Sequence, residues 1–176
     1  MNIDKCEFET KLCHYLGFII EAGKGIQMNS EKVQAIVEWQ APHSVKAVQA
    51  FLGFINFYQQ FIRMFSEITA PLIELTQKDI SFKWMDCTNE TFERLKLMFV
   101  SAPILLKFDL DCKTVVEVNS SEYIVGGLLI QYNSNGILHP CAFFSKKNDP
   151  AECNYKIYNK ELLAIVKCLK EWSSKL

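Results

Sequence analysis

The chain has 176 residues, of which 49% are hydrophobic and 22% are charged, and its formal net charge is −1. This composition excludes a disordered tail, which would have fewer apolar residues and more net charge, and the seven glycines and five prolines exclude a collagen-like chain. A dedicated nucleic-acid-binding domain usually has a basic excess, and this chain has none. We therefore expect a globular protein with one core or two small ones.

Membrane and disulfide classes are also disfavoured. The sequence has no apolar run of about 18 residues, and its first residues lack the pattern of a signal peptide. The seven cysteines are odd in number and never form a Cys-x-x-Cys pair. We expect an intracellular protein, cytoplasmic or nuclear, with reduced thiols and no membrane contact.

In chain order, the first 28 residues predict a small meander of short strands at 6–9, 13–20 and 25–28. A helix is expected to begin at Asn29 or Ser30 and to end before Pro42, because Asn and Ser cap helices and proline stops them.

The strongest periodic signal lies at 43–65, where apolar residues recur every three or four positions. This pattern predicts an amphipathic helix, or a helix pair broken near Gly53. The segment contains Lys46 and Arg63 and no acidic residue, so it is locally basic.

The rest of the chain predicts two more helices, then strands, then a last helix. The first helix is expected around 71–75 with Pro71 in its first turn, and the second from about Thr88. Strand-like runs follow at 114–118, 123–131 and 137–145, with a hairpin signal between the last two. Residues 155–172 return to helical spacing. The predicted fold class is α+β.

A series of motifs in this order resembles the polyprotein of gypsy-type long-terminal-repeat retrotransposons, where reverse transcriptase joins ribonuclease H. The resemblance covers nearly the whole chain. The motifs are Lys5-Cys6-x-Phe8, Leu16-Gly17-Phe18-Ile19-Ile20, Lys32 to Pro42, Phe51 to Ile62, Ala70-Pro71-Leu72, Phe82-x-Trp84, Ala102-Pro103, Ala151-Glu152-x-Asn154-Tyr155 and Lys160 to Val166.

The resemblance implies three parts. Residues 1–28 would end the polymerase palm, 29–110 would form the helical thumb and connection, and 111–176 would be the N-terminal part of a truncated RNase H-like domain, with a three-stranded antiparallel meander and one helix. The family's metal-binding palm aspartates would lie before this segment.

The RNase H chemistry implied by the family needs carboxylates that hold two Mg²⁺ ions. Asn119 stands where the family has its first Asp, and Glu161 matches the second carboxylate, a relic metal ligand or simply a solvated helix residue. The family's later aspartates would fall beyond Leu176. We therefore expect no complete metal site, no cofactor for this chain and no independent catalysis.

Binding of an RNA–DNA or DNA duplex is the family's other implied property, and phosphate contacts supply most of that affinity. Gln49, Gln59 and Gln60 replace basic residues of the family, so we expect weak binding. The candidate contacts are Lys46, Phe57, Tyr58 and Arg63; for the two aromatic residues the alternative is core packing.

Three functions stay open at this point. The first is a degenerate polyprotein fragment without catalysis. The second is a residual module for nucleic-acid binding or protein interaction, including self-association through an exposed strand edge at 114–118. The third is a piece of a longer, active RNA-directed DNA polymerase and ribonuclease H.

Overall fold

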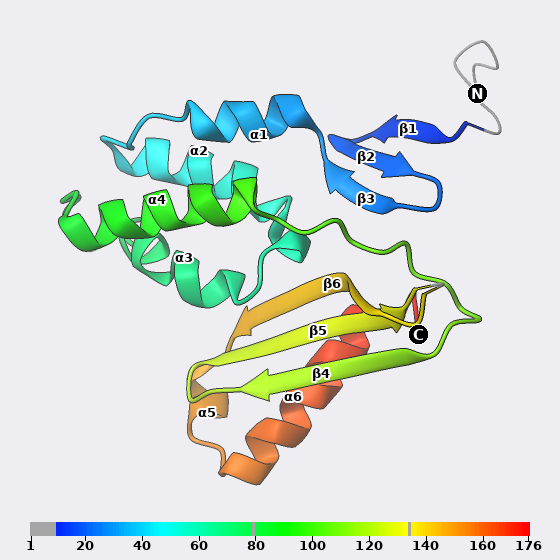
Figure 1. Cartoon of the computed structure of the whole chain (residues 1–176). Coiled ribbons are helices and arrows are strands. Elements are labelled where there is room, and N and C mark those ends of the chain that lie inside the picture. The colour runs from blue at the N-terminus through cyan, green and yellow to red at the C-terminus, as the bar shows by residue number, and fades with distance from the viewer. Residues whose placement is uncertain (1–9, 79, 134) are drawn as a thin grey trace, which may run out of the picture.

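The computed structural model describes residues 10–78, 80–133 and 135–176 (Figure 1). Two three-stranded antiparallel sheets flank a group of helices along the chain. The elements are β1 (Leu12–Tyr15), β2 (Phe18–Glu21), β3 (Gly25–Met28), α1 (Ser30–Val37), α2 (Val45–Asn56), the 3₁₀ turn η2 (Gln59–Phe61), α3 (Phe65–Glu74), α4 (Asp86–Val100), β4 (Thr114–Ser120), β5 (Ile124–Tyr132), β6 (Leu138–Lys147), α5 (Pro150–Cys153) and α6 (Ile157–Glu171).

The first sheet has the order β1-β2-β3. The prediction of a single strand over 13–20 was wrong, because the chain reverses between Tyr15 and Phe18, which pair across the turn. Leu16 and Gly17 make this turn with φ of 49° and 84°, a left-handed pair that matches the twist of a tight hairpin. The strand expected at 6–9 lies outside the described residues.

Helices α1 to α4 enclose the larger core. Asn29 and Ser44 cap α1 and α2, because their side-chain oxygens accept hydrogen bonds from the backbone N–H groups of Glu31 and Ala47. The apolar faces of these helices meet, and β2 and β3 pack against them. Fully buried members of the core include Ile36, Val48, Phe51, Ile55, Leu72, Phe92, Leu95 and Phe99.

The break in the 43–65 helix was predicted at the wrong place. Helix α2 continues through Gly53, whose missing side chain would meet nothing within 4 Å, and ends at Asn56. The chain then forms η2 and turns at Met64, which has φ 55° and ψ 32°. A glycine in an otherwise regular helix is tolerated, whereas a left-handed Met ends the helical path.

The prediction that Pro71 lies in the first turn of a helix was also wrong. Helix α3 begins earlier, at Phe65, so Pro71 lies inside it. Proline has no N–H, and the backbone carbonyl of Glu67 therefore lacks its usual donor four residues on. Glu67 is exposed, so water can satisfy that carbonyl.

The second sheet has the order β4-β5-β6, and α6 covers one of its faces (Figure 1). Val125, Leu129 and Ala142 of the sheet pack with Ala164, Cys168 and Trp172 to form a second, smaller core. Gly127 allows α6 to approach closely, since a Cβ there would lie 2.5 Å from the Cys168 sulfur. Within the described strands, β4 pairs only with β5 and forms an edge.

Hydrogen bonds join the N-terminal part of the chain to the second sheet at two places. Leu105 forms an antiparallel bridge with Ile26 of β3, and the N–H of the next residue, Leu106, donates to the carbonyl of Pro140 in β6. Separately, the Ser66 hydroxyl at the start of α3 donates to the Ser145 carbonyl at 2.8 Å, and the Ser66 N–H donates to the Ser145 hydroxyl at 3.1 Å. The two cores are therefore connected at distinct points.

The α+β class and the three-stranded antiparallel meander with a following helix are confirmed. The strands at 114–120, 124–132 and 138–147 agree with the runs expected from the sequence, and the additional short helix α5 precedes α6. In the described ranges, no helix is both long enough and apolar enough to cross a bilayer.

Candidate nucleic-acid interface

The two cations proposed from the sequence lie on the helical part. Lys46 is exposed in the first turn of α2, and Arg63 is exposed in the turn between η2 and α3. Neither forms an ion pair with another residue that the structure describes. Both charges are therefore available to an anion such as a phosphate group.

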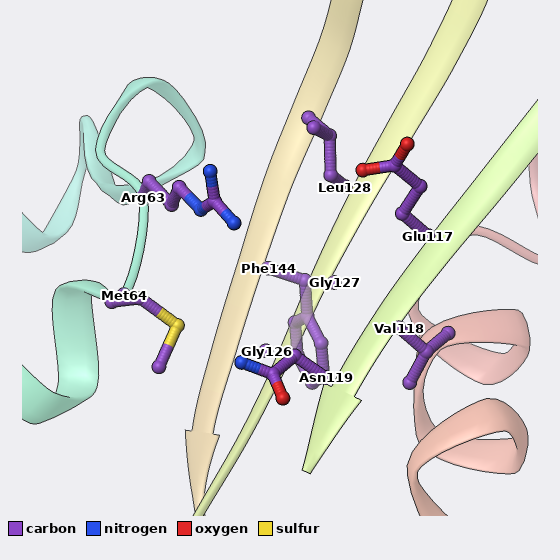
Figure 2. Close-up of a pocket in the computed structure, with 9 residues that line it drawn as sticks. All are labelled: Arg63, Met64, Glu117, Val118, Asn119, Gly126, Gly127, Leu128 and Phe144. Carbon is purple, nitrogen blue, oxygen red and sulfur yellow. The ribbon is translucent and has the colours of Figure 1, made fainter.

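Arg63 faces the second sheet across a pocket of about 400 Å³. Figure 2 shows its guanidinium group pointing toward the strands, with Met64 below it. The opposite wall comes from β4 and β5, where Glu117 and Asn119 line the pocket. The structure thus brings together Arg63 and Asn119, two candidates that are 56 positions apart in the sequence, and adds a carboxylate beside them.

The side chains of β4 alternate between the two faces of the sheet. Val118 packs toward α6, whereas Asn119 points to the other side, toward Met64 (Figure 2). Glu161 is exposed on α6 and does not line the pocket that contains Asn119. The two positions expected from the RNase H resemblance are therefore not gathered in one pocket.

The residues present do not fit a two-metal site. Among those that the structure describes, no group of three or more His, Cys, Asp and Glu side chains is placed to hold a metal ion. Asn119 offers a neutral amide oxygen, which does not offset the charge of two divalent ions. Among the described residues that line the pocket, Glu117 is the only carboxylate, and it lies on the wall opposite the Arg63 guanidinium group.

Met64, at the edge of the pocket, has a strained backbone conformation. A non-glycine residue in the left-handed region costs roughly 1–2 kcal/mol and persists only where its surroundings hold it. Here the Met64 sulfur lies against Gly126 of β5, where a Cβ would come within 2.8 Å of it. The absence of a side chain at Gly126 therefore leaves room for the Met64 thioether against the sheet.

Of the two aromatic candidates, Phe57 lies at the surface and Tyr58 lies in the core. Tyr58 is only 3% exposed and packs against Phe18, Phe54 and Phe99, so it cannot reach a duplex and belongs to the core. Burial raises the pKa of its hydroxyl above the ordinary value. Phe57 is 50% exposed and remains available to a ligand.

Two residues of the pocket, Glu117 and Met64, were not predicted from the sequence. Glu117 could have been found, because it is two positions before Asn119 in a strand and must share its face. Met64 had no signal in the sequence, since its role follows from a turn geometry that the local sequence does not specify.

Burial raises the pKa of the Cys141 and Cys168 thiols to about 11, so these cysteines are poor nucleophiles.

Comparison with known proteins agrees with this architecture. Residues 84–176 match the family model for the RNase H-like domain found in reverse transcriptase. Over 172 residues, 98% of this chain, the sequence is 34% identical to the Transposon Tf2-3 and Tf2-4 polyproteins of Schizosaccharomyces pombe. The chain spans 13% of the length of these relatives.

Solved structures of the foamy viral protease-reverse transcriptase share the fold. Its complex with an RNA/DNA hybrid has a TM-score of 0.78 and 27% identity over 92% of this chain and 22% of that one. Its complex with double-stranded DNA has a TM-score of 0.77 and 28% identity over 94% of this chain and 34% of that one. The retrotransposon resemblance is confirmed, and the chain belongs to the family of RNase H-like domains found in reverse transcriptase.

Proposed function

We propose that this chain is a nucleic-acid-binding segment of a retrotransposon-type reverse transcriptase and ribonuclease H region, without catalysis of its own. One observation carries the proposal: a single pocket is lined by Arg63, which forms no ion pair with another described residue, and by Asn119, where the family resemblance expects an Asp. A cation and an amide can both donate hydrogen bonds to a phosphate, whereas a carboxylate would repel it unless a metal ion lay between them.

The electrostatics favour weak duplex binding. Each phosphate contact releases about one counterion, and Lys46 and Arg63 are the cations that remain in the helical segment 43–65, where Gln49, Gln59 and Gln60 stand in place of basic residues. Glu117 in the same pocket opposes an anion. The foamy viral structures are complexes with an RNA/DNA hybrid and with double-stranded DNA, and this supports a duplex as the partner.

Within this proposal, residues 1–28 end the palm, 29–110 form the thumb and connection, and 111–176 belong to the RNase H-like domain. The Mg²⁺ of the parent family is not held by this chain. We place the chain inside the cell, which is supported by the free thiols of the cysteines that the structure describes.

Fluorescence anisotropy with an RNA–DNA duplex across a salt series tests the binding proposal. Arg63→Gln should weaken binding at low salt and reduce the slope of log Kobs against log salt by about one. Arg94→Gln is the matched control, since the chain's other arginine is exposed on α4 and lines no part of the pocket. Equal slopes for the two variants would contradict the proposal.

Inactivity is tested separately. Incubation with an RNA–DNA hybrid in Mg²⁺ should release no RNA fragments. Cleavage that disappears in Glu161→Gln would show that Glu161 is a working ligand and that the chain is an enzyme in its own right.

A second candidate function is self-association through β4. The strand lies at the edge of its sheet, with one described neighbour, and an edge of unpaired backbone groups can pair with another chain. Sedimentation velocity should then show a concentration-dependent dimer, which Val115→Lys reduces because an edge lysine opposes pairing. A monomer at all concentrations would remove this candidate.

A further inference from the structure

A second pocket adjoins the Arg63 pocket and has a different character. Its volume is about 360 Å³, and Phe144 lines both pockets. Most of its wall is aromatic or aliphatic, with polar groups only from two glutamines and one glutamate. The lining residues are Leu16, Phe18, Phe57, Gln59, Gln60, Phe143, Phe144 and Glu171.

Phe57 is the exposed ring of this pocket and is held in a fixed orientation. Its centroid lies 5.3 Å from that of Phe18 with the ring planes 18° apart, a stacked arrangement. Phe18 in turn stacks on buried Phe61 at 5.5 Å. Half of the Phe57 side chain nevertheless remains exposed. An immobilised, half-exposed aromatic ring loses little entropy when a planar ligand stacks on it.

The polar groups select for a neutral, planar ligand with hydrogen-bonding edges. The described residues of the lining include no Lys or Arg, and the Glu171 carboxylate repels phosphate, so the pocket does not suit an anion. Gln59 and Gln60 each offer an amide that can both donate and accept. Neither side chain is hydrogen-bonded to another residue in the described part of the chain, so both amides are available. A purely apolar ligand would leave these amides unused.

We propose that the pocket around Phe57 takes an unpaired nucleobase of a single-stranded nucleic-acid segment. A base in a duplex is stacked on both faces and cannot enter, whereas an unpaired base can stack on Phe57 and meet the glutamine amides at its edge. The phosphate that follows would face Arg63 in the adjoining pocket. The inference rests on the proposed nucleic-acid binding and adds a preference for unpaired bases.

The test compares two duplexes of equal length, one blunt and one with a short single-stranded overhang that contains 2-aminopurine. The overhang should increase affinity, and stacking should quench the 2-aminopurine fluorescence. Phe57→Leu keeps an apolar side chain but removes the aromatic face, so it should lose at least about fivefold in affinity for the overhang duplex. The loss should be greater for the overhang duplex than for the blunt duplex, which offers no unpaired base.

Two further variants keep the result interpretable. Phe57→Tyr retains the aromatic face and should bind the overhang like the original chain. Tyr158→Leu makes the same kind of change at an exposed aromatic residue of α6 and should have no effect. Thermal melting of each variant, followed by circular dichroism, separates a binding defect from unfolding.

The two proposals fail differently. If the overhang adds no affinity and Phe57→Leu binds like Phe57→Tyr, the base pocket is refuted while duplex binding stands. If the blunt duplex does not bind, the proposed function fails, and the same 2-aminopurine measurement on a single-stranded oligonucleotide still decides the inference. Quenching that Phe57→Leu abolishes supports it, and unchanged quenching overturns it.

Discussion

The close contact between β5 and α6 predicts that Gly127→Ala destabilises the RNase H-like part. A Cβ at this position would lie 2.5 Å from the Cys168 sulfur and 3.0 Å from Cη2 of Trp172. The optimum separation of non-bonded heavy atoms is about 3.5–4.0 Å, so the overlap is about 1 Å. Both neighbours are buried and have little room to move. Overpacking of this size should cost about 2 kcal/mol, a decrease in Tm of about 4–8 °C.

The adjacent glycine provides the control. At Gly126 a Cβ would meet the Met64 sulfur at 2.8 Å, but that sulfur is at the end of a flexible side chain and can rotate away. Replacing glycine by alanine also reduces the entropy of the unfolded chain. Gly126→Ala should therefore change the free energy of unfolding by less than about 1 kcal/mol.

Urea denaturation followed by circular dichroism at 222 nm measures both variants. A double-mutant cycle with Cys168→Ala should show a favourable coupling of about 1 kcal/mol, because the smaller residue removes the sulfur that the new methyl group contacts. If Gly127→Ala proved as stable as Gly126→Ala, the close packing of α6 on β5 would be refuted.

Three other outcomes are expected. The pKa of Glu152 is lowered chiefly by its hydrogen bond to Lys167, so the stabilising effect should be complete above about pH 4.5 and be lost as the pH falls through the folded-state pKa. Glu152→Gln should cost about 1 kcal/mol at pH 7 and less in acid, as measured by urea unfolding at several pH values. Gln131→Ala should cost about 0.5–1.5 kcal/mol, because it removes a buried amide that bonds the Asp109 backbone and the Thr114 hydroxyl, and should speed hydrogen exchange at the Asp109 amide. Thiol labelling at pH 8 with mass-spectrometric mapping should spare Cys141 and Cys168, whose raised pKa values leave almost no thiolate, until the chain unfolds.

The sequence predicted the elements better than their ends and junctions. β-Rich runs and the Asn133–Gly136 turn signal located β5 and β6, because strand propensity and turn chemistry are local properties. The helix break was misplaced at Gly53, since the cost of a glycine in a helix is small and the true end depends on how Phe57 and Tyr58 pack against Phe18.

The candidate site was predicted residue by residue but not as an arrangement. Arg63 and Asn119 were both identified, yet nothing local indicates that they face one pocket, because that follows from the left-handed turn at Met64 and the close approach to Gly126. Tyr58 shows the opposite case: a helical aromatic stripe indicates burial for some rings and exposure for others, and only the tertiary packing assigns them.

The two attachments between the helical part and the second sheet have a mechanical consequence. A body fixed at a single point can swivel, but one fixed at both the Leu105–Leu106 link and the Ser66–Ser145 pair can only rock about the line through them. Twisting of the helices relative to the sheet is therefore restricted, and rocking about that line is the motion that remains.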